Sequence, residues 1–159
     1  YCDKLTEIKV DARNTSYTSI GGVLFDKPET ALVQYPAGKQ DNTYTIPYKV
    51  KKIVNEAFFN CKRLTGITLP ASVISIGNRA FFGCDGLTSI TFPASVTFIG
   101  YQAFYNSKGL TSITIPPSVT EIRFSAFYNC SNLKTVTLSQ KTQVGSDAFP
   151  PSAQLIYKD

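Results

Sequence analysis

A repeat of 23 residues runs through most of this 159-residue chain and constrains what the chain can fold into. A strand-like motif that ends in Pro or Ser recurs at this interval at 44–47, 67–70, 90–93, 113–116 and 136–139. A period of this length is typical of stacked-repeat proteins. Because one such unit cannot bury its apolar face alone, neighbouring units must stack in register and share a core. The sequence therefore predicts an elongated solenoid.

The residues within one repeat predict its local structure. Ile90 and Phe92 share one face and Thr91 takes the other, which is the alternation of a half-buried strand. Pro93 ends that strand because proline cannot donate to a strand ladder. We expect 103–110 to form a single α or 3₁₀ turn, because it is too short for a regular helix. The predicted fold class is a β-rich repeat solenoid with short parallel strands in two parallel sheets and short helical or 3₁₀ turns.

The chain divides into regions by how well they keep the repeat. We expect an irregular N-terminal repeat with a β-hairpin insertion at 1–43, regular repeats at 44–149, and a terminal cap or the start of a following segment at 150–159. The spacing of apolar residues in 5–10 matches that in 64–69, so the array is expected to begin before residue 1. A glycine pair at 21–22 and a following turn predict a hairpin with arms 23–25 and 32–35.

Composition and repeat positions argue against catalysis. The chain has no His, so acid-base chemistry at neutral pH would have to use carboxylates. Asp85, Glu121 and Asp147 occupy different columns of the repeat, and Glu56 stands alone. No pair of facing carboxylates is therefore predicted. We expect no enzyme activity, no catalytic residue and no cofactor.

The four cysteines share one column of the repeat. Cys2, Cys61, Cys84 and Cys130 lie at the same position, which Ser107 fills in the remaining unit. None has the close C-x₂-C spacing of a zinc site, so no metal site is predicted. Because side chains of one column run parallel, we predict small buried residues with free thiols, including the adjacent pair Cys61 and Cys84.

The net charge of +5 does not indicate nucleic-acid binding, because Lys and Arg are interspersed with Asp and Glu. No apolar run of about 18 residues is present, so no membrane span is predicted in this sequence. One basic cluster stands out, consisting of Lys49, Lys51, Lys52, Lys62 and Arg63. A solvated face is its default interpretation, and a site for an anionic glycan or an acidic protein is the alternative.

Two outward columns are candidate binding surfaces, because exposed side chains carry recognition. One is a threonine column on the leading strand, and the other is an aromatic column after the repeated Ala-Phe pair. The candidate residues are Thr68, Thr91, Thr114 and Thr137, preceded by Thr45, and Phe82, Tyr105 and Tyr128, preceded by Phe59. Thr is a good strand former, so structure alone also explains the first column. The aromatic rings either form an outward stripe suited to recognition or pack against neighbouring turns.

The repeat resembles the BspA-like leucine-rich repeats. The resemblance rests on the unit L-x-x-I-x-[LIF]-P-x-S-V-x-x-I-G-x-x-A-F-x-x-C, as in 64–84, and on the irregular elements 17–27 and 35–39. Ser72, Ser95 and Ser118 stand where the general leucine-rich pattern has Asn or Cys, which argues against transfer from horseshoe-shaped animal receptors. The resemblance implies a right-handed leucine-rich-repeat superhelix. It also implies a surface-exposed or secreted protein of a host-associated bacterium. Several members of the family are linked to adhesion to host proteins.

The leading functional hypothesis is an extracellular or cell-surface module that binds a protein, with a host extracellular protein as the expected partner. One alternative is a stiff structural spacer whose own surface binds nothing. Another is a glycan-binding module that uses the aromatic column and the basic cluster.

Overall fold

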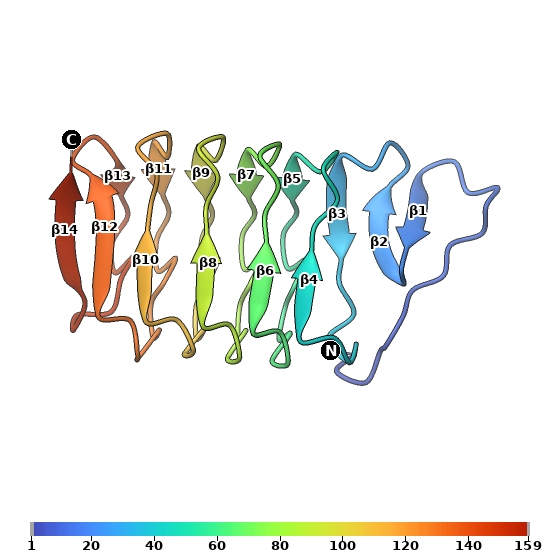
Figure 1. Cartoon of the computed structure of the whole chain (residues 1–159), viewed down its shortest axis with the longest axis horizontal. Helices are drawn as coiled ribbons and strands as arrows, with labels where there is room; N and C mark the ends of the chain where they lie inside the picture. The colour runs from blue at the N-terminus through green and yellow to red at the C-terminus, as the bar shows by residue number, and fades with distance from the viewer. Residues whose placement is uncertain (1, 159) are drawn as a thin grey trace.

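The computed structural model describes residues 2–158, which form an elongated stack of β-strand rungs (Figure 1). One long sheet forms the back of the stack and contains, in spatial order, β1 (Tyr17–Ile20), β2 (Val23–Asp26), β3 (Ala31–Gln34), β5 (Lys52–Ile53), β7 (Ser75–Ile76), β9 (Phe98–Ile99), β11 (Glu121–Ile122) and β13 (Gln143–Val144). Two shorter sheets form the front, one with β4 (Thr43–Thr45), β6 (Gly66–Thr68) and β8 (Ser89–Thr91), the other with β10 (Ser112–Thr114), β12 (Thr135–Ser139) and β14 (Gln154–Lys158). The predicted β-rich solenoid with short parallel strands is confirmed.

Parallel pairing joins residues that are one repeat apart. On the front, Ile67 pairs with Ile90, and on the back, Ile76 pairs with Ile99. In-register strands lie about 4.8 Å apart, so each column of the sequence stacks on itself at this spacing. Side-chain contacts between neighbouring rungs are therefore mostly contacts between like residues.

At the N-terminal end, β2 and β3 pair antiparallel, as expected for the predicted hairpin with arms 23–25 and 32–35, and β1 adds a further antiparallel strand that was not predicted. The β1–β2 turn uses Gly21 and Gly22, whose φ values of 56° and 78° suit a tight hairpin turn. On the front, β8 and β10 belong to separate sheets, so the ladder is interrupted there. The back sheet continues past the same level because β9 pairs with β11.

The return segment of each rung leads from a back strand to the next front strand. The helical or 3₁₀ turns expected from the sequence are absent within residues 2–158, where these segments consist of hydrogen-bonded turns. Arg79 and Gly83 have φ values of 54° and 68°, which a right-handed helix excludes. Amides also bond to the next rung, since Phe81 N donates to Ala103 O at 2.7 Å. The return segments therefore form a third ladder instead of helical turns.

Stacked aromatic rings fill the centre of the solenoid. Phe104 is fully buried, and its ring centroid lies 4.9 Å from that of Phe81 and 4.8 Å from that of Phe127. The stack continues towards the two ends through Phe58, Tyr35 and Phe149. Such pairs contribute about 0.5–1.5 kcal/mol each beyond their area of burial. The repeated Ala-Phe pair thus supplies the core.

The cysteine column lies beside this stack. Cys84 is buried and its thiol donates to Phe58 O at 3.1 Å, while Ser107, one rung later, donates to Phe81 O at 2.8 Å. All four thiols are free, as predicted. The expectation of burial is wrong for Cys2, which is exposed because no described rung covers its outer side.

The buried thiols predict a loss of stability at alkaline pH. Burial raises the pKa of Cys61 and of Cys130 from 9.0 to about 12, and it also raises the pKa of Cys84. Between pH 9 and pH 12 the unfolded chain loses these protons while the folded chain keeps them, so the free energy of unfolding falls as pH rises. Replacing Cys61, Cys84 and Cys130 by Ser should flatten this decline, as measured by chemical unfolding at several pH values. If the free energy of unfolding fell just as steeply with pH in this variant, the buried thiols would not be the cause of the decline. Cys2→Ser is the control, because Cys2 is exposed.

Candidate binding surface

Four aromatic side chains form a ladder on the outside of the return segments. The members of this aromatic ladder are Phe59, Phe82, Tyr105 and Tyr128, with successive ring centroids 5.0, 5.1 and 5.8 Å apart. The first two pairs are within 5° and 4° of parallel. Three of the rings are half-buried, and Tyr128 is 37% exposed. The rings therefore lie at the surface and also pack on one another, which combines the two alternatives left open by the sequence.

Tight turns of the backbone hold each ladder residue in place. Phe82 N donates to Arg79 O at 3.1 Å, and Gly83 N donates to Tyr105 O on the next rung at 2.8 Å. Arg79 and Gly83 both have positive φ, so the chain bends on either side of Phe82. Because the same turn recurs on successive rungs, the repeat itself fixes where each ring lies.

A second aromatic pair and an arginine lie beside the ladder. The rings of Tyr101 and Phe124 stack with centroids 5.6 Å apart, and Phe124 is 44% exposed. The guanidinium carbon of Arg79 lies 6.0 Å from the ring centroid of Phe82 and 5.9 Å from that of Tyr101, within cation–π range. We define the aromatic surface as Arg79, Phe82, Tyr101, Tyr105, Phe124 and Tyr128.

The sequence analysis missed Arg79, Tyr101 and Phe124 because their columns are not uniform. Asn55 and Asn78 occupy the positions equivalent to Tyr101 and Phe124 on earlier rungs. Asn78 has a structural role there, since its Oδ1 accepts from Tyr101 N at 2.9 Å. The signal that could have revealed the pair is the replacement of Asn by an aromatic residue on two adjacent rungs.

The threonine column lies on the front strands, which is a different segment of the rung from the aromatic ladder. The strand pairing places its members side by side, as Thr45 with Thr68, Thr68 with Thr91, and Thr114 with Thr137. Thr137 is half-buried and the others are exposed. Within residues 2–158, none of their hydroxyls has a hydrogen-bond partner in the protein. The column is thus a polar face that is open to solvent.

A hollow of 310 Å³ interrupts the threonine column where β8 and β10 separate. Its lining consists of Ser89, Ile90, Thr91, Ser112, Ile113 and Thr114, without a charged or aromatic side chain. The structure therefore does not combine the two predicted columns into one site. Of the two predicted columns, the aromatic one has a cation beside its rings, since Arg79 lies next to Phe82.

The predicted basic cluster does not form one patch. Lys49 Nζ pairs with Glu29 Oε2 at 3.0 Å. Lys52 lines a hollow on the back sheet, whereas Lys62 and Arg63 line a different hollow beside the N-terminal segment. These groups lie on different segments of one rung, with Lys52 in β5 and both Lys62 and Arg63 in the return segment between β5 and β6.

Two further features bear on function. Among residues 2–158, no group of three or more His, Cys, Asp or Glu side chains could hold a metal ion. The same part of the chain has no helix with the length and apolar character needed to cross a membrane.

Two of the carboxylates considered in the sequence form ion pairs. Glu121 pairs with Arg123 at 2.6 Å, and Glu56 pairs with Arg79 at 3.7 Å.

A parallel solenoid of short rungs with a shared apolar core is the architecture of leucine-rich-repeat proteins, a class that is typically non-catalytic. A model of the BspA type leucine-rich repeat region matches residues 35–156 in six copies. The chain belongs to this family. No curated protein matches the sequence.

Solved structures of bacterial leucine-rich-repeat proteins are similar over nearly the whole chain. A leucine-rich cell surface protein from Faecalibacterium prausnitzii A2-165 is 30% identical with a TM-score of 0.87, over 98% of this chain and 42% of that one. A leucine-rich repeat protein from Eubacterium ventriosum is 29% identical with a TM-score of 0.81, over 93% and 43% of the two chains. The pneumococcal vaccine antigen PcpA shares the fold at 21% identity, with a TM-score of 0.66 over 97% and 50%. The chain thus spans less than half the length of the first two proteins.

Proposed function

We propose that this chain is a non-enzymatic module of a secreted or cell-surface bacterial protein and binds a protein partner through the aromatic surface. The observation that carries the proposal is the position of Arg79 between the rings of Phe82 and Tyr101 at the surface. Aromatic residues and Arg are enriched at the centres of protein interfaces. The similarity to a leucine-rich cell surface protein supports the location. A host extracellular protein is the proposed partner, with adhesion as the outcome.

The ring arrangement favours a protein over a sugar at this surface. Phe82 stacks on both Phe59 and Tyr105, so both faces of its ring are covered. Stacking of a sugar needs an open ring face, whereas a protein can also contact ring edges. These edges carry partial positive charge and suit the carbonyl and carboxylate oxygens of a partner.

The aromatic surface is also held in place before any partner arrives. Arg79 Nε donates to Gln102 Oε1 at 3.0 Å, and Arg79 Nη1 lies 3.7 Å from Glu56 Oε1. Side chains that are already ordered lose less entropy on binding. A rigid surface of this kind supports specific recognition.

Removal of the outer rings should weaken binding strongly. Surface plasmon resonance against purified matrix and plasma proteins would identify the partner and give its Kd. The double variant Phe124→Ser/Tyr128→Ser should raise that Kd by about thirtyfold or more, because even one aromatic hot spot contributes about 2 kcal/mol or more. Tyr48→Ser is the matched control, since it removes a 78% exposed ring from another turn and should leave Kd unchanged.

Two results would overturn the proposal. A partner whose binding is lost with Thr91→Lys but not with the double variant would place recognition on the front strands. The absence of any partner across the screen would favour the spacer hypothesis.

A further inference from the structure

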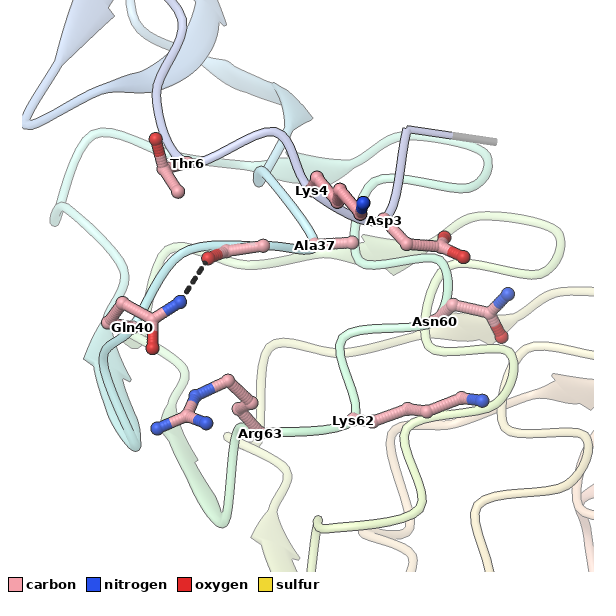
Figure 2. A pocket seen from close by; sticks show the side chains of 9 residues that line it. Asp3, Lys4, Thr6, Ala37, Gln40, Asn60, Lys62 and Arg63 are labelled. Carbon is pink, nitrogen blue, oxygen red and sulfur yellow. Dashed lines mark hydrogen bonds between the residues drawn. The ribbon is translucent and has the colours of Figure 1, made fainter.

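A hollow of 470 Å³ lies between the N-terminal segment and the first regular rung (Figure 2). This volume is in the range of small-molecule sites and is larger than a single ion requires. The cationic side chains of Lys4, Lys62 and Arg63 line it. Within residues 2–158 none of these three side chains forms an ion pair, so their charges are available to a ligand.

The hollow exists because the turn at Gly38 carries no large side chain. This turn lies between the N-terminal segment with Lys4 and the first regular rung with Arg63. Gly38 packs directly on the rung of Lys4, since Gly38 N donates to Leu5 O at 2.8 Å and a Cβ at Gly38 would lie 2.6 Å from Lys4 C. The next rung carries Arg63, because β4 pairs with β6 just after these turns. We define the Gly38 notch as the gap lined by Asp3, Lys4, Ala37, Gly38, Lys62 and Arg63. Its floor is Ala37 and Gly38, and its two walls are the flanking rungs.

The walls of the notch present charges at separate places. Figure 2 shows the Arg63 guanidinium extending towards the Gln40 side chain and Lys62 extending the other way, below Asn60. Gln40 Nε2 donates to Gly38 O at 2.8 Å, which leaves the Gln40 side-chain oxygen as an acceptor. Asp3 supplies further acceptors on the opposite wall. Cationic groups and hydroxyl-binding groups therefore alternate around the notch.

We propose that the Gly38 notch binds an acidic saccharide. A carboxylate or sulfate group would accept from the forked guanidinium of Arg63, which suits planar and tetrahedral oxyanions. The sugar hydroxyls would bond to Asn60, Gln40 and Asp3. The lining has no aromatic or large apolar side chain, and such side chains are the usual anchors for a peptide. The notch uses none of the residues of the aromatic surface, so this proposal is independent of the proposed function.

Isothermal titration with defined oligosaccharides tests the proposal. A heparin-derived hexasaccharide and a galacturonate hexamer should bind, whereas neutral maltohexaose should not. Arg63→Gln should raise Kd by roughly tenfold, because it removes charge-assisted hydrogen bonds. Arg63→Lys should give an intermediate Kd, since it keeps the charge and loses the fork. Ala37→Gln should also weaken binding, because its longer side chain fills the floor.

Lys108→Gln is the matched control for charge. Lys108 occupies the repeat position of Lys62 on a later rung and is exposed, so the change in net charge is the same and Kd should not change. Equal weakening by Lys108→Gln and Arg63→Gln would overturn the proposal, since binding would then depend on net charge alone. Hexaglutamate binding as tightly as the acidic sugars would instead identify an acidic-peptide site. Failure of both acidic sugars to bind, or full binding by a correctly folded Ala37→Gln variant, would also overturn it.

Discussion

Replacing Phe104 by Ala should lower the free energy of unfolding by about 3–5 kcal/mol. The ring is fully buried and lies between the rings of Phe81 and Phe127, with centroids 4.9 and 4.8 Å away. The substitution removes both ring contacts and leaves a cavity in the middle of the stack. The neighbouring rungs are held by hydrogen-bonded ladders and cannot close that cavity fully. Chemical denaturation at neutral pH measures the loss.

Phe82→Ala is the matched control for this experiment. It removes a ring of the same size that also stacks on two neighbours, but this ring is half-buried at the surface. Water can occupy the space that it leaves, so the loss of stability should be clearly smaller. Equal losses from Phe82→Ala and Phe104→Ala would show that burial in the central stack is not what stabilises the array.

Gly100→Ala should destabilise the protein even though it adds a single methyl group. A Cβ at this position would lie 2.7 Å from both Asn78 N and Gly77 C. These are backbone atoms of the preceding rung, and they cannot move aside without disturbing the ladder of the back sheet. Overpacking of this kind costs about 1–3 kcal/mol, and more where the backbone must shift. Thermal unfolding should show a clearly lower midpoint than the parent chain.

Gly66→Ala provides the comparison. A Cβ at Gly66 would lie 3.6 Å from Thr43 Cγ2, which is an ordinary van der Waals distance. This variant should be neutral, or more stable by about 0.4–1 kcal/mol because Ala restricts the unfolded chain. Equal unfolding midpoints for Gly100→Ala and Gly66→Ala would show that close contact between rungs is not the reason for glycine in the column of Gly100.

The fold could be predicted because nearly every column repeats. The 23-residue interval that separates Ile67 from Ile90 in the sequence is also their pairing register in the front sheet. The turn conformation could not be predicted in the same way. Arg79 has a left-handed φ of 54°, which is uncommon for a residue with a side chain, and its amide donates to Tyr101 O on the next rung at 2.8 Å. Contacts between rungs thus override local helical preference.

The site was only partly predictable for a related reason. The positions of Phe82 and Tyr105 follow from the repeat, but their half-burial depends on how closely adjacent rings stack. Arg79, Tyr101 and Phe124 interrupt their columns, so periodicity alone does not mark them. The choice of the aromatic and threonine columns as recognition surfaces, and the division into irregular, regular and terminal regions, stay predictions.

The interruption between β8 and β10 has a mechanical consequence. At this level the back sheet continues through β9 and β11 while the front ladder does not. A bending force that stretches the front therefore has no strand-to-strand hydrogen bonds to break at this step, and local opening costs least where few such bonds are lost. We therefore expect the regular array to bend most easily at this step, where the back sheet and the return segments carry the connection between rungs.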